Sequence, residues 1–159
     1  MIPTLENNSC ALAGAPSPAD LVLLFERFMA YWRGTVVHLT GLEEATFGPD
    51  PIECAVEWGG RAKGRLALKF DPSFYPWLVD QQDFRRINLS TEDELLKEIT
   101  ALYGLYFLRF FAIQDLMENG PLTPRRLSVG AAALPEPDRR VWVRVEKSPV
   151  EIKLWWGAG

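Results

Sequence analysis

The sequence contains too few cysteines for a disulfide framework or a metal cluster. It has two, Cys10 and Cys54, among 159 residues, and its single histidine is His38. Disulfide scaffolds and structural zinc sites of small proteins need several cysteines or histidines at fixed spacings. We therefore expect no metal and no cofactor, and the composition fits a reducing, cytoplasmic environment.

Strong net charge and long hydrophobic segments are also missing. The 17 basic and 21 acidic residues give a net charge of -4. This balance does not predict a basic surface for binding nucleic acid or an anionic membrane. No apolar run approaches the roughly 18 residues that a membrane span requires. Residues 1–16 are rich in small and polar side chains and do not resemble a secretion signal. We expect a flexible leader over residues 1–16 and a single soluble domain over 17–159.

Two amphipathic helices have clear start signals. The first begins at Ser17, a cap followed by Pro18, and its apolar residues recur at helical spacing up to Gly34. The second spans residues 91–119, with Thr91 and Glu94 forming a capping box. At ~1.5 Å per residue this helix is roughly 40 Å long, so we expect it to be the spine of the fold.

The remaining elements follow the alternating pattern of half-buried strands. A hairpin is predicted over residues 52–70, and a short helix over 74–82. A second hairpin spans 141–156, with its turn expected at Ser148-Pro149. Short strands are expected at 35–39 and 126–129. The predicted fold class is α+β: an antiparallel sheet of two hairpins with a long central helix and two shorter helices.

The order of these elements resembles the CheC/CheX family of chemotaxis phosphatases. The similar segments are residues 64–70 (GRLALKF), 94–100 (ELLKEIT) and 141–156 within a resemblance from about Leu21 to Trp156. The resemblance implies an antiparallel αβ fold, often a homodimer. It also implies hydrolysis of the aspartyl phosphate on a CheY-type response regulator.

The family motif is Glu-x-x-Asn on the long helix, usually with a glycine four residues after the asparagine. In the family, the carboxylate grips a lysine of the regulator and the amide orients the attacking water. Glu98 matches the acid and is the expected catalytic residue, but Ala101 replaces the amide. The family glycine would fall at Leu105, whereas this chain has Gly104. A methyl group cannot hold a water, so the resemblance implies a weak or lost phosphatase activity. Neither Thr100, which is turned about 100° from the Glu98 face, nor the distant Gln114 is a good substitute.

A stripe along this helix is the expected binding surface for the regulator. It is formed by Glu94, Glu98, Ala101 and Leu105, which the spacing places on one side of the helix. The alternative is that Glu98 is an ordinary solvated helix residue.

Aromatic residues on the second hairpin suggest an interface. Trp142 and Trp155 fall on the polar faces of their strands, where direct pairing would create an aromatic patch. That patch either forms a dimer interface, in which tryptophan is enriched, or lies under a helix. Cys54 alternates with inward residues and is expected in the core, and we assign His38 a structural or surface role.

Three functions remain open from the sequence. The first is a CheX-like protein of chemotaxis or two-component signalling that binds a CheY-type regulator. The second is a non-catalytic homodimeric adaptor on the same fold, whose binding would ignore the phosphate. The third is small-ligand binding, which requires a preformed apolar pocket.

Overall fold

A computed structural model of the chain describes residues 16–33, 39–40, 44–58, 64–81, 91–110, 123–127 and 135–156. Three helices and six strands lie within these ranges. In chain order they are α3 (Pro18–Arg33), β1 (Leu39–Thr40), β2 (Ile52–Trp58), β3 (Gly64–Phe70), α4 (Phe74–Gln81), α6 (Glu92–Phe110), β4 (Arg125–Leu127), β5 (Arg139–Val145) and β6 (Ser148–Trp156).

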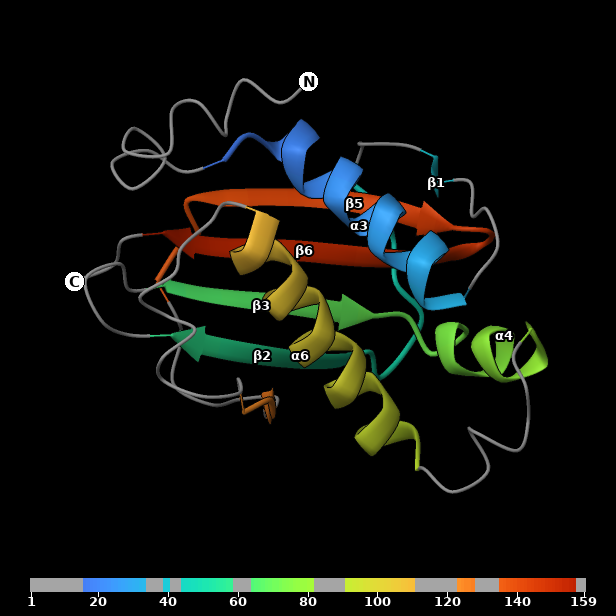
Figure 1. The fold of residues 1–159 in the computed structure, drawn as a ribbon. Coiled ribbons are helices and arrows are strands. Elements are labelled where there is room, and N and C mark those ends of the chain that lie inside the picture. The colour runs from blue at the N-terminus through green and yellow to red at the C-terminus, as the bar shows by residue number, and fades with distance from the viewer. Residues whose placement is uncertain are drawn as a thin grey trace.

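The strands form one sheet in the order β1-β5-β6-β3-β2-β4, with every neighbouring pair antiparallel (Figure 1). The two predicted hairpins are β2–β3 and β5–β6, and they join side by side through β3 and β6. The edge strands β1 and β4 contain only two and three residues. The predicted α+β class, with its sheet of two hairpins, is confirmed.

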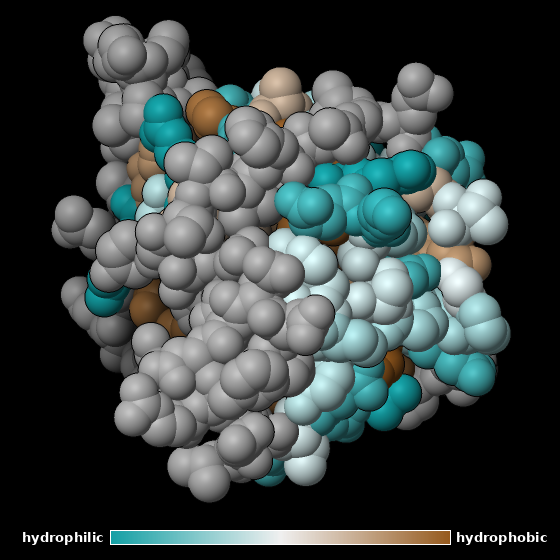
Figure 2. All heavy atoms as spheres, turned by 90° about the vertical axis from the view of Figure 1, so that its right-hand side faces the viewer, coloured by the Kyte–Doolittle hydropathy of each residue, from teal (hydrophilic) through white to brown (hydrophobic). Residues whose placement is uncertain are grey.

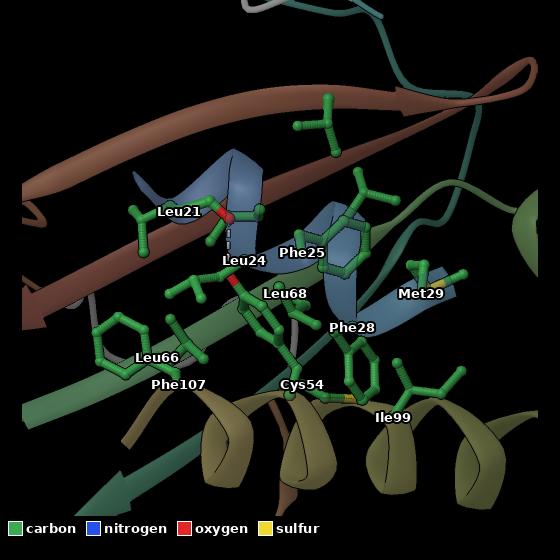
Figure 3. Close-up of a cluster of buried hydrophobic side chains, with 14 of the residues drawn as sticks. Leu21, Leu24, Phe25, Phe28, Met29, Cys54, Leu66, Leu68, Ile99 and Phe107 are labelled. Carbon is green, nitrogen blue, oxygen red and sulfur yellow. Dashed lines mark hydrogen bonds between the residues drawn. The ribbon is translucent and has the colours of Figure 1, made fainter. Parts of the chain in front are cut away.

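Both long helices cover the same face of the sheet. Figure 1 shows α3 over β5 and β6, α6 crossing β2 and β3 obliquely, and α4 beyond one end of the strands. Side chains of α3, α6 and the strands point toward one another between these layers (Figure 3). The period-2 pattern of the strands and the 3.6-residue pattern of the helices thus direct one face of each element into this layer. The largest fully buried side chains are Tyr103, Phe25, Phe70, Phe74, Phe107, Leu21, Leu24, Met29, Leu66, Leu68 and Leu78.

Tyr103 ties α6 to α3. Its side chain is fully buried, and its hydroxyl donates a 2.9 Å hydrogen bond to the Leu21 carbonyl. Its ring packs edge-on against Phe25, with 5.2 Å between the ring centroids. Burial raises the pKa of the Tyr103 hydroxyl, so the group remains a hydrogen-bond donor throughout the physiological range. This contact fixes the orientation of α6 on the core.

The predicted helix starts are confirmed by reciprocal capping bonds. The Ser17 hydroxyl accepts from the Asp20 N–H, and the Asp20 carboxylate accepts from the Ser17 N–H. Thr91 and Glu94 exchange the same pair of bonds, each 3.2 Å long, at the start of α6. The expected end of this helix at residue 119 lies outside the described residues, as do residues 1–15 and 35–38.

The turn of the second hairpin was predicted in the wrong place. It is formed by Glu146 and Lys147, while Ser148 and Pro149 already belong to β6, opposite Val145 and Arg144. Glu146 adopts a φ of 59°, as the tight two-residue turns of hairpins require. Pro149 is tolerated because it lies near the start of its strand.

Asp71 joins the loop before β2, the start of α4 and the end of β3. Its carboxylate accepts hydrogen bonds from the N–H groups of Gly48, at 2.7 Å, and Ser73, at 2.9 Å. Burial acts to raise the pKa of Asp71, but the hydrogen bonds from Gly48 and Ser73 outweigh it and leave the pKa below its ordinary value. The ionised carboxylate therefore stabilises the folded state.

We expect Asp71→Asn to lower the free energy of unfolding by about 1–2 kcal/mol at pH 7. Because the folded-state pKa is depressed, this contribution is present above about pH 4 and is lost as the pH falls further. Urea unfolding at several pH values should show parent and variant converging in acid. Asp50→Asn is the matched control, because Asp50 is exposed and asparagine tolerates its φ of 58°. A difference that persists unchanged in acid would contradict the assignment.

Figure 2 views the end of the molecule that carries α4 and the turn between β5 and β6. The described side chains on this face are mostly hydrophilic or intermediate, and the hydrophobic ones form small, separate areas. Where it is described, this end carries no broad apolar surface.

Candidate functional site

The outer face of α6 carries the motif residues that the sequence singled out. The buried side of the helix consists of Leu95, Leu96, Ile99, Thr100, Tyr103, Gly104, Phe107 and Leu108. On the opposite side, Glu94 and Glu98 are exposed, whereas Ala101 and Leu105 are half-buried. No other described helix or strand lies over this face (Figure 1). The structure therefore brings the four predicted binding residues onto one accessible surface, called the α6 face below.

The Glu98 side chain is exposed on α6. Within the described parts of the chain, its side chain has no ion pair or hydrogen bond. Ala101 lies one helical turn further on and packs partly against the core. The spacing of Glu98 and Ala101 thus offers a carboxylate and, beside it, only a methyl group.

Thr100 does not replace the missing amide. It is fully buried, and its hydroxyl donates a 2.9 Å hydrogen bond to the Leu96 carbonyl one turn earlier in the helix. Aligning the motif on Gly104 would put Thr100 in the amide position, but this burial rules that reading out. Gln114 lies outside the described residues. No polar side chain therefore takes the place of the amide on the described part of α6.

The start of α6 is held in place by ionic and capping contacts. Arg126 on β4 reaches Asp93 with 2.9 Å between guanidinium nitrogen and carboxylate oxygen. The Thr91 capping box closes the first turn. Three acidic residues in that turn also interact favourably with the helix dipole. These contacts fix the first turn of α6 relative to β4.

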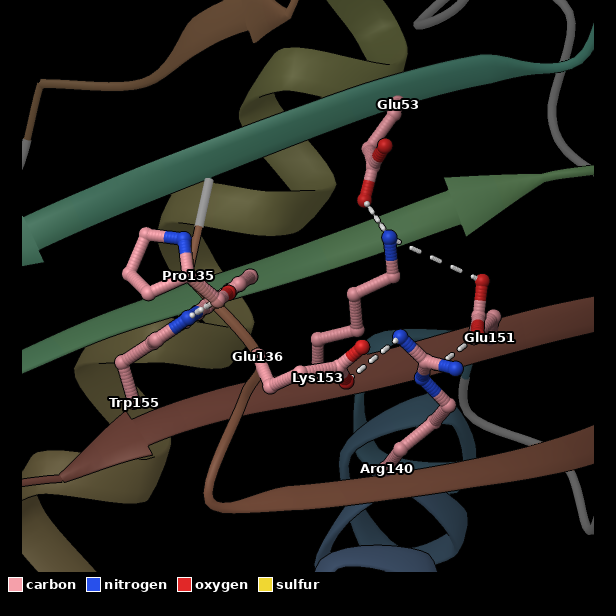
Figure 4. Close-up of polar contacts among 7 residues, drawn as sticks. All are labelled: Glu53, Pro135, Glu136, Arg140, Glu151, Lys153 and Trp155. Atoms are coloured by element: carbon pink, nitrogen blue, oxygen red, sulfur yellow. Dashed lines mark hydrogen bonds and ion pairs between the residues drawn. The ribbon is translucent and has the colours of Figure 1, made fainter. Parts of the chain in front are cut away.

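The face of the sheet opposite the helices carries a charge network that sequence reasoning missed. Lys153 on β6 lies 2.9 Å from Glu53 and 3.9 Å from Glu151, and Arg140 lies 3.3 Å from Glu151 (Figure 4). The Glu151 side chain is only 7% exposed, and those of Lys153 and Glu53 are 18% and 20% exposed. Burial raises the pKa of Glu151, although the charges of Lys153, Lys69 and Arg140 oppose this shift.

The alternating charges of the strands were the available signal for this network. Glu53 is on β2, whereas Lys153 is on β6, and β3 lies between these strands. Their contact therefore depends on strand order and register, which alternation along one strand does not specify. The network is structural, and we assign it no part in the chemistry of the α6 face.

The predicted pairing of Trp142 with Trp155 is wrong. Trp142 lies opposite Glu151, so Trp155 is four residues, or roughly 13 Å, further along β6. Trp155 is 4% exposed, and its indole N–H donates a 2.8 Å hydrogen bond to the Pro135 carbonyl. A loop and the Arg65 side chain, 5.4 Å from the ring centroid, thus cover it where a helix was the expected alternative. A dimer interface at these tryptophans stays a prediction, to which Trp155 has little surface left to contribute.

Cys54 is fully buried in β2 beneath α6, as predicted. Burial, the largest cause, raises the pKa of its thiol to about 11. Since the thiolate is the reactive species, we expect alkylation of native Cys54 at pH 8 to be at least about a hundredfold slower than in the unfolded chain. Mass spectrometry of the peptide that contains Cys54 would measure this separately from Cys10. Rapid labelling of the native protein would show that β2 and α6 separate readily. His38 and Cys10 lie outside the described residues.

The described residues offer few other features to a ligand. No group of three or more histidine, cysteine or acidic side chains among them is arranged to hold a metal ion. None of the described helices has both the length and the apolar character needed to cross a bilayer.

Solved structures with the same fold come from chemotaxis proteins. The chain is similar to the chemotaxis protein CheX from Vibrio vulnificus, with a TM-score of 0.52, 12% identity, and coverage of 84% of this chain and 95% of that one. It is also similar to a chain in the CheX–CheY–BeF3–Mg complex from Borrelia burgdorferi, with a TM-score of 0.50, 13% identity, and coverage of 87% and 96%. No protein-family model and no curated protein sequence matches the chain. The predicted resemblance is thus confirmed at the level of the fold, through these CheX structures.

Proposed function

We propose that this chain is a CheX-like protein of bacterial chemotaxis or two-component signalling, with weak or lost aspartyl-phosphate phosphatase activity. It binds a CheY-type response regulator through the α6 face. The observation that supports this most is the position of Glu98: exposed, without an ion pair to the described residues, and one turn from Ala101 on the long helix of a CheX-like fold. In the Borrelia burgdorferi complex, CheX is bound to CheY together with BeF3 and Mg²⁺.

The chemistry of the α6 face suits a partner that presents a lysine beside an apolar surface. Glu94 and Glu98 supply negative charge on the first half of the helix, and Leu105 supplies apolar surface beyond them. A charge-assisted hydrogen bond from a lysine to Glu98 would fix the register of docking. The half-buried leucine would add apolar contact area.

The α6 face lacks the side chain on which catalysis would depend, one that positions a water. Hydrolysis of an acyl phosphate depends mainly on positioning a water in line with the breaking P–O bond. Ala101 cannot position a water, and the Thr100 hydroxyl is occupied by the Leu96 carbonyl. Docking through Glu98 does not need the amide, so binding can remain where turnover is lost.

The proposal predicts that Glu98→Ala weakens binding to the activated regulator by about tenfold, because it removes one charge-assisted hydrogen bond. Isothermal titration calorimetry would compare parent and variant against the CheY-type receivers of the source organism, each loaded with BeF3⁻ and Mg²⁺. Glu136→Ala is the matched control, since Glu136 is an 88% exposed carboxylate on the opposite side of the sheet.

Three outcomes separate the candidate functions. Tighter binding of the BeF3⁻-loaded receiver, weakened only by Glu98→Ala, supports the proposal. Equal binding of loaded and unloaded receivers favours the non-catalytic adaptor. If no receiver of the panel binds, the proposed function is wrong.

A further inference from the structure

We propose that the α6 face protects the phosphoryl group of the docked regulator from water, so that the chain prolongs the phosphorylated state. This inference rests on the proposed docking function and specifies what docking does. It follows from the distribution of polar groups along the outer side of α6, where the stretch around Ala101 carries no polar side chain that could hold a water.

Polar side chains on this side of the helix stop at Glu98 and resume at the half-buried Tyr106 and the exposed Arg109. The half-buried residues between them on that side are Ala101, Leu102 and Leu105, all apolar. The gap from Glu98 to Tyr106 is eight residues, or roughly 12 Å of helix.

The gap also lacks hydrogen-bonding groups that could hold a water. The N–H and C=O groups of the helix backbone bond to one another. The Thr100 hydroxyl is buried and already donates its hydrogen bond to the Leu96 carbonyl. An ordered water in a closed site needs about two to four polar partners. A water between the α6 face and a docked phosphoryl group would find no partner on the α6 side, so contact favours its expulsion.

Expelling that water blocks the reaction. In hydrolysis, a water oxygen forms a bond to phosphorus as the bond from phosphorus to the aspartyl oxygen breaks. The products are a carboxylate and inorganic phosphate, and the water gives up a proton. A site closed against water suppresses the hydrolysis of a reactive group. Glu98 would hold the complex together from outside the gap, since its carboxylate lies on the exposed side one turn before Ala101.

The test measures loss of ³²P from a phosphorylated CheY-type receiver, after removal of the phosphodonor, as the concentration of this chain increases. The receiver used is the one that binds this chain most tightly among the CheY-type receivers of the source organism. Its binding is measured separately with the BeF3⁻ form. We expect the decay to slow by about tenfold at saturation, with half-maximal protection at the measured Kd.

Two substitutions at one position distinguish water exclusion from mere binding. Ala101→Val keeps the gap apolar and should retain protection. Ala101→Ser places a hydroxyl in the gap and should reduce protection at equal occupancy. Ala101 is half-buried on the helix surface, so both variants are expected to fold, which circular dichroism would verify.

Each outcome decides a different part of the argument. Binding with slowed decay supports the inference. Binding with unchanged or accelerated decay overturns protection and leaves the docking function standing. Absence of binding across the whole panel overturns the docking function and the inference together.

Discussion

Replacing Ala101 with asparagine should turn this chain into a phosphatase for the CheY-type regulator proposed above. We expect Ala101→Asn to speed loss of the aspartyl phosphate by roughly a hundredfold over the parent complex, the usual effect of one well-placed group that stabilises a transition state. Under the proposed function, Glu98 on α6 supplies the docking carboxylate, and Ala101 stands where the CheC/CheX motif would have its amide. Release of inorganic phosphate from a phosphorylated CheY-type receiver is the measurement.

The position of the new amide provides the control. Leu105→Asn puts the same side chain on the same half-exposed surface one turn further along α6, where it should not accelerate the reaction. The double variant Glu98→Ala, Ala101→Asn should be slower than Ala101→Asn at subsaturating concentration, because docking is weakened. An Ala101→Asn variant that binds the receiver but leaves the decay unchanged would show that the α6 face does not reach the phosphate.

Removing Lys153 should cause the largest loss of stability among the polar substitutions considered. We expect Lys153→Met to lower the free energy of unfolding by about 3 kcal/mol, because it leaves the partly buried carboxylates of Glu53 and Glu151 without their shared cation. Arg140 remains beside Glu151 but does not reach Glu53 among the ion pairs of the described residues. Urea unfolding would measure the difference.

The effect should depend on pH in a defined direction. Burial already holds the pKa of Glu151 above its ordinary value, and the Lys153 charge opposes this. Without Lys153 the pKa rises further. A carboxyl with a raised folded-state pKa binds its proton more tightly when folded, so stability falls as the pH rises through that pKa. The destabilisation should therefore be smallest near pH 4 and largest above neutrality.

Two further variants test the assignment. Arg144→Met, an exposed cation on the same face of β5, should change stability by less than about 0.5 kcal/mol. Adding Glu151→Gln to Lys153→Met should recover part of the loss, because the unpaired buried charge is then absent. A loss below about 1 kcal/mol for Lys153→Met alone would show that water already screens the network.

The elements of this fold could be predicted from the sequence because their signals are local. The cap at Thr91 is a bond between residues three apart, and the burial of Cys54 follows from alternation within one strand. The candidate site could be predicted for the same reason, because helix geometry places Glu98 and Ala101 on one face. The hairpin turn was misplaced because Ser148-Pro149 is a common turn sequence, whereas Glu146 reaches its positive φ without a glycine.

The sequence by itself determined the helices, the hairpins and the polar and apolar faces, since each depends on contacts within a few residues of the chain. Only the tertiary structure decided which side chains meet across strands. It placed Lys153 between two carboxylates, covered Trp155 with Pro135, and turned Thr100 into the core. The physical reason is that strand order and register bring together residues distant in sequence, and burial then fixes the energies of their charges and hydrogen bonds.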